Sequence, residues 1–270
     1  MIRFGFSYSS FLEKKDYVNL FGEGLRVVEI NPLTPKDLVL FLRDIGFEIT
    51  FHIGFLRGIN PSYPIEGIRK EVVREILREI EYGISFGSSN FTLHGGYVPW
   101  FDFLPQSYEE YEEYLSIAMS ERHLHIEALR KSVEEIIKTF PQVKIAIENV
   151  YFPFELFNNP SELRDFVFSF ENLYVTLDFG HAKISSYKIY DYVNELKERI
   201  VKLHLHTNDT LYDVHRSIIN VDPDFAMSLR SLNDLQTDIV GIIELHRDKN
   251  AILTSFENIK EVLRGGEKEA

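Results

Sequence analysis

Histidine and carboxylate side chains recur in this sequence at spacings that suit metal ligands. Asp178 precedes His181 by three residues and Asp213 precedes His215 by two, so each pair can offer an oxygen and a nitrogen to one cation. The chain contains no cysteine, so any metal must be held by imidazole and carboxylate groups. Such donors without thiolate suit zinc, manganese or iron. The two pairs therefore indicate a divalent metal site.

The same residue types also close short segments rich in β-branched and aromatic residues. Six of these segments end in a possible ligand: His52, His94, Glu148, Asp178, His206 and Glu244. The residues two positions earlier share the same face of each strand, and they are Thr50, Thr92, Ala146, Thr176, His204 and Ile242. We expect His204 to be an interior histidine that supports the ligands. Clustered carboxylates repel one another and resist burial unless cations compensate them. Six possible ligands at equivalent strand ends therefore indicate a metal-binding site.

Eight such segments alternate with helical patterns along the chain. We predict strands at Ile2–Tyr8, Val27–Ile30, Ile49–Gly54, Asn90–His94, Lys144–Glu148, Tyr174–Asp178, Val201–His206 and Ile239–Glu244. Helices are predicted at Thr34–Ile45, Pro64–Phe86, Ser107–Thr139, Ser161–Phe170, Ile189–Leu196, Pro223–Leu235 and Ser255–Leu263. This alternation is typical of parallel βα units.

The number of strands and the chain length of 270 residues favour a (β/α)8 TIM barrel. A doubly wound open sheet is the alternative, but it usually carries a glycine-rich phosphate turn between a strand and a helix. The Gly95-Gly96 pair follows a strand, yet no helical pattern follows it. We therefore predict a single α/β barrel over residues 1–264 and a short C-terminal tail at 265–270. The metal site is expected at the C-terminal mouth, where barrel enzymes place their catalytic residues.

The overall charge limits the partners of the protein. The 42 acidic and 29 basic residues give a net charge of −13, which argues against a broad electrostatic footprint for nucleic acid but not against a local basic groove. No apolar run approaches the length of a membrane span, and no signal segment opens the sequence. We expect a cytoplasmic protein with no membrane association and no disulfide-linked partner.

In motif and order, the sequence resembles the xylose-isomerase-like TIM barrel superfamily, and within it the endonuclease IV family of zinc-dependent abasic-site nucleases. The resemblance runs from His52 to Glu244. It rests on the motifs Phe-His-Ile-Gly-Phe-Leu, Leu-His-Gly-Gly, Ile-Glu-Asn, Leu-Asp-Phe-Gly-His-Ala, His-Thr-Asn-Asp and Asp-Val-His, and on the final glutamate. All nine ligand positions of that family are occupied here by the expected residue type.

The resemblance implies three metal ions, most simply zinc. One ion would take His52, His94 and Glu148. A second would take Glu148, Asp178, His206 and Glu244. A third would take His181, Asp213 and His215.

Four segments depart from the endonuclease IV pattern. The first strand carries Phe6 in place of a histidine, and the loop after Glu148 reads Val-Tyr-Phe-Pro-Phe in place of a polar glycine-rich loop. Ile219-Asn-Val221 replaces a Gly-x-Gly motif, and Asn31-Pro-Leu-Thr replaces a basic, aromatic loop that faces DNA in the family. These departures leave the ligands intact but remove features that serve a DNA substrate.

Two enzymatic functions follow from these observations. The first is metal-dependent phosphodiester hydrolysis of abasic-site DNA, with Glu148 and Glu244 as catalytic residues and two or three ions. In that case Phe55 and Leu56 would enter the base stack beside Arg57, with Arg216 as a further substrate contact. The alternative is a sugar or sugar-phosphate isomerase or epimerase, in which Glu148 and Glu244 hold a single ion such as manganese and move a proton beside a carbonyl. The acidic charge and the missing DNA loops favour this alternative. The third-metal ligands His181, Asp213 and His215 favour the nuclease, because an isomerase does not need them, and we take the nuclease as the first prediction.

Overall fold

The structure is a computed structural model that describes residues 2–54, 58–98, 107–208, 212–235 and 237–265. Its centre is a closed barrel of parallel strands, in which each strand pairs with the next along the chain and β8 pairs with β1. The strands are β1 (Arg3–Ser7), β2 (Val27–Ile30), β3 (Glu48–His52), β4 (Asn90–His94), β5 (Lys144–Glu148), β6 (Leu173–Asp178), β7 (Ile200–Leu205) and β8 (Val240–Ile243). The predicted (β/α)8 barrel is confirmed.

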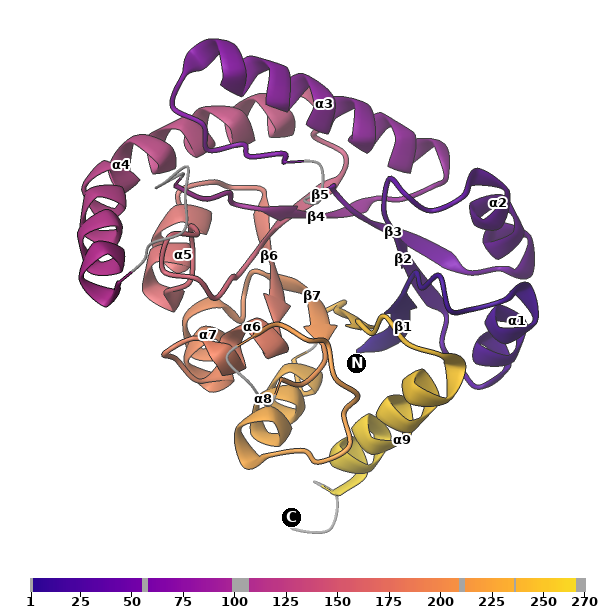
Figure 1. The fold of residues 1–270 in the computed structure, drawn as a ribbon. Helices are drawn as coiled ribbons and strands as arrows, with labels where there is room; N and C mark the ends of the chain where they lie inside the picture. The colour runs from indigo at the N-terminus through magenta and orange to yellow at the C-terminus, as the bar shows by residue number, and fades with distance from the viewer. Residues whose placement is uncertain (1, 55–57, 99–106, 209–211, 236, 266–270) are drawn as a thin grey trace.

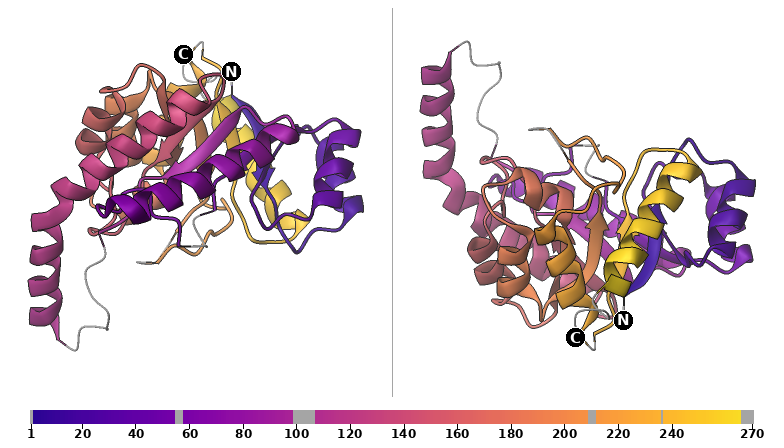
Figure 2. Two further views of the ribbon diagram at one scale, coloured as in Figure 1. Left: turned by 90° about the horizontal axis from the view of Figure 1, so that it is seen from above. Right: turned by 90° about the horizontal axis from the view of Figure 1, so that it is seen from below.

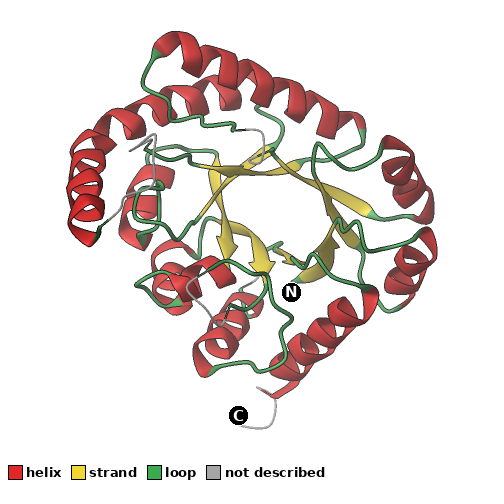
Figure 3. Ribbon diagram, in the orientation of Figure 1, coloured by secondary structure: helices red, strands yellow, loops and turns green. Residues whose placement is uncertain are grey.

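Helices surround the barrel as an outer ring (Figures 1 and 3). They are α1 (Lys14–Gly22), α2 (Lys36–Ile45), α3 (Glu66–Ser85), α4 (Tyr108–Thr139), α5 (Pro160–Val167), α6 (Phe179–Ile184), α7 (Ile189–Leu196), α8 (Pro223–Asn233) and α9 (Lys249–Gly265). The views from above and from below show that the first half of α4 projects beyond the body of the barrel (Figure 2). None of the helices in the described ranges combines the length and the apolar character that crossing a membrane requires.

The sequence patterns missed α1 and α6 and placed the start of α9 six residues late. α1 buries only Tyr17 and Leu20, so its apolar stripe is too short to show as a period. α6 has six residues and begins directly after β6, where the Asp178 side chain accepts a hydrogen bond from the backbone of His181 at 2.6 Å. A ligand candidate thus also serves as a helix cap.

The interior of the barrel changes from apolar to polar along its axis. Val27, Val240 and Ile242 form an apolar cluster separate from the main core between strands and helices. The hydroxyl groups of Thr92 and Thr176, each two residues before a strand-end ligand, lie 2.9 Å apart and are fully buried. Because side chains alternate along a strand, the residues two positions further on form the floor of the mouth.

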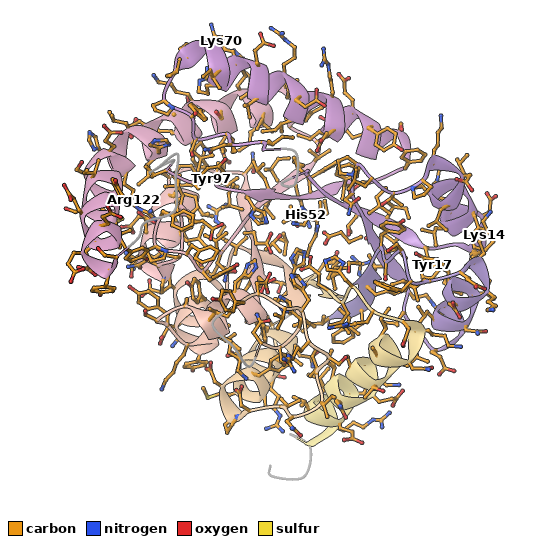
Figure 4. All side chains as sticks on the ribbon, viewed as in Figure 1. Lys14, Tyr17, His52, Lys70, Tyr97 and Arg122 are labelled. Atoms are coloured by element: carbon orange, nitrogen blue, oxygen red, sulfur yellow. The ribbon has the colours of Figure 1, made fainter. Side chains whose placement is uncertain are left out.

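The loop between β5 and α5 is held in place by α4. The Arg122 guanidinium forms two hydrogen bonds with the Glu162 carboxylate, at 2.8 and 2.6 Å, and donates another to the Pro153 carbonyl at 3.2 Å. Arg122 is buried, and its label in Figure 4 marks where α4 meets this part of the barrel. The arginine therefore fixes the loop that forms one wall of the site.

Candidate metal centre

The possible ligands gather at the carboxyl ends of the strands, as predicted. His52, His94, Glu148 and Asp178 are the last residues of β3, β4, β5 and β6, and His206 and Glu244 directly follow β7 and β8. Parallel strands place these ends at one mouth of the barrel. Figure 4 shows His52 near the middle of the ring of strands, far from Lys70 and Lys14 on the outer helices.

The first set of neighbouring donors, here called the His52 group, consists of His52, His94 and Glu148. Their ligand atoms lie within 4.8 Å of one another. Nε2 of His94 lies 2.9 Å and Nε2 of His52 lies 3.2 Å from Oε2 of Glu148. Nδ1 of His52 is 2.9 Å from the carbonyl of Ile53, which directs Nε2 toward the glutamate. The group matches the first ligand set that the resemblance implied.

The second set, here called the central group, consists of Glu148, Asp178, Glu244 and His204. Nδ1 of His204 lies 2.7 Å from Oε1 of Glu148 and 3.0 Å from Oε2 of Glu244. His206, which we expected here, instead places Nε2 at 3.1 Å from Oδ2 of Asp178, on the side of His181. The structure therefore brings His204 of β7 and His206, directly after β7, to the floor, with His204 among the carboxylates.

The third set, here called the Asp213 group, consists of Asp213, His215 and His206. Oδ2 of Asp213 lies 2.7 Å from Nε2 of His215 and 3.3 Å from Nε2 of His181, so the predicted trio of His181, Asp213 and His215 is assembled around one carboxylate. The rings of His206 and His215 stack with centroids 4.1 Å apart. His181 lies with Asp178 and His206 in a fourth set of neighbouring donors, so every predicted ligand belongs to at least one set at this mouth.

Local contacts explain why the loops present these side chains. Asn208 donates to Asp213 at 3.1 Å and accepts from the Val214 backbone at 2.9 Å, which closes the loop after β7. Gly180 packs so closely on His206 that an added Cβ would lie 1.9 Å from Cε1 of the ring. Only glycine fits at position 180, because any side chain there would displace the His206 imidazole.

Buried charges dominate the electrostatics of the site. Burial alone would raise the pKa of Glu148 and of Glu244, but the adjacent imidazoles hold both well below the usual range. Burial would lower the pKa of His204, yet the surrounding carboxylates raise it well above its usual value. Burial likewise opposes protonation of His215, but the hydrogen bond to Asp213 and the charge of Glu244 raise its pKa to about 9. In the metal-free protein, protons on imidazoles therefore compensate the carboxylates.

This donor set fits divalent cations. The carboxylates at the floor have imidazoles as their closest cationic partners, and Nδ1 of His206 is buried without a hydrogen-bond partner among the described residues. Metal ions replace protons on such ligands when they bind. Imidazole and carboxylate donors with no thiolate suit zinc, manganese or iron.

A pocket of about 390 Å³ opens directly above these groups. Besides the ligands, its lining includes Tyr151, Phe152, Glu155, Leu33 and His246. Tyr151 and Phe152 form an aromatic wall with ring centroids 4.2 Å apart. Glu155 is buried, and burial raises the pKa of its carboxyl group. None of the described lining residues is a lysine or an arginine.

The sequence reasoning missed Glu29 and Lys202 beneath the floor and Glu155 in the pocket wall. Glu29 and Lys202 are buried inside the barrel and form an ion pair. The sequence does carry a signal for Glu29 and Lys202. Each is a single acidic or basic residue within an otherwise largely apolar strand, Val27–Ile30 or Ile200–Leu205. Glu155 stands in an irregular loop, where no periodic pattern indicates which way a side chain points.

Of the predicted substrate contacts, Arg216 alone lies within the described residues. Phe55, Leu56 and Arg57 fall outside the described residues. Arg216 is exposed, and its backbone exchanges hydrogen bonds of 2.8 and 2.9 Å with Thr207. It borders a neighbouring groove that also includes Lys183 and Arg247.

Comparisons with known proteins place this arrangement among related barrels. The sequence profile described as xylose isomerase-like TIM barrel matches residues 14–265. No curated protein matches the sequence. Among solved structures, a D-tagatose 3-epimerase-like protein has a TM-score of 0.76 and 24% identity, with 100% of each chain covered.

Two further solved structures show the range of this fold. Endonuclease IV from Thermus thermophilus has a TM-score of 0.69 and 15% identity, covering 97% of this chain and 99% of that chain. The IOLI protein with a bound zinc atom has a TM-score of 0.68 and 17% identity, covering 97% and 98%. At these identities the likeness establishes the fold and leaves the reaction open.

Proposed function

Because the chain belongs to the xylose isomerase-like TIM barrel family, we propose that it is a metal-dependent phosphodiesterase that cleaves abasic-site DNA, as endonuclease IV does. One observation carries this proposal: Asp213 gathers His181 and His215 beside the other two groups. A single-ion isomerase has no need of this additional carboxylate and imidazole set. Endonuclease IV is also among the solved structures that share the fold.

The ligands would hold two or three zinc ions, and Glu148 would be shared between ions. Its Oε2 faces His52 and His94, whereas its Oε1 faces His204 in the central group. Ions bound there would supply Lewis-acid chemistry, activating water near neutral pH and stabilising charge on phosphate oxygens. Glu148 and Glu244 would orient the attacking water on the pocket floor, since both line the pocket.

The substrate contacts follow from the same proposal. Phe55 and Leu56 would act as an apolar wedge that opens the base stack at the lesion, a device common among DNA-bending proteins. Arg57 and Arg216 would contact phosphate groups. Arg216 directly follows His215 in the chain, so a phosphate held by the Asp213 group would lie near this arginine.

A sugar epimerase is the second candidate, and the pocket favours it. Its volume of about 390 Å³ and its aromatic wall, with no lysine or arginine among the described lining residues, suit a small uncharged substrate. Glu148 and Glu244 both lie within 3.0 Å of Nδ1 of His204, so their carboxylates are neighbours on the floor. Two such groups can hold and return a proton beside a substrate carbonyl.

The experiment pairs two assays on the same metal-replete protein: cleavage of duplex DNA with one abasic site at low salt, and interconversion of a ketose panel. Both are run with zinc and with manganese. Under the proposal, His215→Ala removes one metal ion per chain by elemental analysis and reduces DNA cleavage about 100- to 1000-fold, since one ion contributes several kcal/mol. His123→Ala, in the exposed part of α4, is the matched control and keeps full cleavage.

The contrary result is equally definite. If wild-type protein turns over a ketose and leaves abasic DNA intact, the epimerase is the correct function. His215→Ala would then retain its single ion and show only weaker sugar binding.

A further inference from the structure

A buried ion pair lies inside the barrel, beneath the metal-ligand groups. Glu29 on β2 and Lys202 on β7 are 2% and 0% exposed, and Nζ of Lys202 lies 2.6 Å from Oε1 of Glu29. Lys202 also donates to the Thr92 hydroxyl at 3.0 Å. An ammonium group buried this deeply keeps its carboxylate partner ionised, because a lone buried charge is strongly destabilising. Oε1 of Glu29 is thus engaged by Lys202.

The other oxygen of Glu29 faces His204. Nε2 of His204 lies 2.8 Å from Oε2 of Glu29. The contact is bent away from ideal hydrogen-bond geometry, but neither atom has another hydrogen-bond partner among the described residues. Because an ionised carboxylate can only accept, Nε2 of His204 must carry a proton. Without a metal, Nδ1 of His204 also carries a proton, since it hydrogen-bonds the Glu148 carboxylate. A metal ion that displaces this proton leaves the other proton on Nε2 and finds the lone pair on Nδ1.

Nδ1 faces the carboxylates of the central group. Nδ1 of His204 lies 2.7 Å from Glu148, 3.0 Å from Glu244 and 3.7 Å from Asp178. We propose that Glu29, anchored by Lys202, is a positioning residue that sets the tautomer of His204 and thereby makes its Nδ1 a metal ligand. The ion concerned is the one that the carboxylates of the central group would hold.

The arrangement follows a general rule for metal sites. A ligating histidine is oriented by the group that accepts a hydrogen bond from its other nitrogen, and loss of that acceptor costs about 10- to 100-fold in metal affinity. The inference rests on the metal dependence of the proposed function and not on its substrate. It stands for either reaction, since both use the central group.

Glu29→Gln tests the inference because it keeps the volume and removes one acceptor. Lys202 and His204 contact different oxygens of Glu29, and an amide has only one oxygen. The charged Lys202 takes that oxygen, so the amide NH2 faces His204 and Nε2 must accept. The proton then moves to Nδ1, and we expect zinc affinity to fall about 10- to 100-fold.

The double variant Glu29→Gln with Lys202→Met is the matched rescue. Without the ammonium group, the amide can turn its oxygen to His204 and its NH2 to Thr92, whose Oγ1 lies 3.4 Å from Oε1 of Glu29 in the wild type. The original tautomer returns, and zinc affinity should recover to within about threefold of wild type. If Glu29→Gln lowered zinc affinity only by disturbing the fold, the additional loss of Lys202 would not restore that affinity.

Two readouts decide the matter: competitive titration of metal-free protein with zinc alone, and ¹⁵N NMR of the zinc-loaded protein labelled at histidine. We expect His204 in the wild type to show a protonated Nε2 and a metal-bound Nδ1. A protonated Nδ1 in the wild type, or unchanged zinc affinity in either Glu29→Gln or His204→Ala, would overturn the inference. Failure of DNA cleavage would overturn the proposed substrate while leaving both readouts unchanged.

Discussion

Carboxylates pair with basic side chains in two regions of the molecule, the outer face of α3 and the barrel mouth. The two regions differ in how far these pairs are buried. On α3, Arg74 pairs with Glu71 while 57% and 66% of their side chains are exposed. At the mouth, Asp178 and Glu148 are 0% and 1% exposed. Water screens the first kind of pair, so it contributes little to stability. The second kind resists burial and has imidazoles as its neutralising partners, as expected of side chains that could hold a metal ion.

The largest effect is expected from Glu148→Gln. The substitution keeps the side-chain volume but removes the charge shared by the His52 group and the central group. We expect activity to fall by about 1000-fold or more, because several kcal/mol of metal-dependent stabilisation are lost. Metal content per chain should fall, while the far-ultraviolet circular dichroism spectrum stays unchanged.

Glu71→Gln is the matched control for that variant. It is the same chemical change on the exposed face of α3, and it should leave turnover and metal content at wild-type levels. Undiminished turnover in Glu148→Gln would refute the assignment of this residue under either candidate function.

Zinc should stabilise the folded protein through the mouth alone. A ligand that binds the native state at 1,000 times its dissociation constant adds about 4 kcal/mol to the free energy of unfolding. We expect the midpoint of thermal unfolding to rise with added zinc in the wild type. The rise should be much smaller in Asp178→Asn, and unchanged in Glu71→Gln. Equal stabilisation of all three proteins would place the zinc elsewhere.

A smaller effect is expected from pH in the metal-free protein. The pKa of His215 is raised from 6.5 to about 9 in the folded state. The stability that this shift contributes is fully present below about pH 6.5 and is lost as the pH rises through about 9. The contribution is about 3 kcal/mol. Denaturant titrations at pH 6 and pH 9 should therefore differ more in the wild type than in His215→Ala. A difference of the same size in both proteins would contradict the role of His215.

The smallest effect is expected on α3. Arg74→Ala removes an exposed pair with Glu71, and the free energy of unfolding should change by less than about 0.5 kcal/mol. Urea titration measures the change. A loss above about 1.5 kcal/mol would mean that surface pairs matter here as much as buried ones, and the contrast with the mouth would fail.

The sequence by itself determined the barrel and which candidate ligands stand at the ends of its strands. Strands of β-branched residues ending in His52, His94, Glu148 and Asp178 are local patterns, and parallel strands bring their carboxyl ends to one edge whatever the details of packing. The short helix α6 escaped detection because its six residues form too few turns for a hydrophobic period.

Only the tertiary structure decided which of those residues lie next to one another in each group of donors. His204 and His206 both point inward by alternation, and the strand pattern cannot say which one meets Glu148 and Glu244. Glu29 and Lys202 are 173 residues apart in the chain and meet because the closed barrel brings β2 and β7 together across its interior. Such a contact depends on strand tilt and register around the whole barrel, which no local spacing encodes.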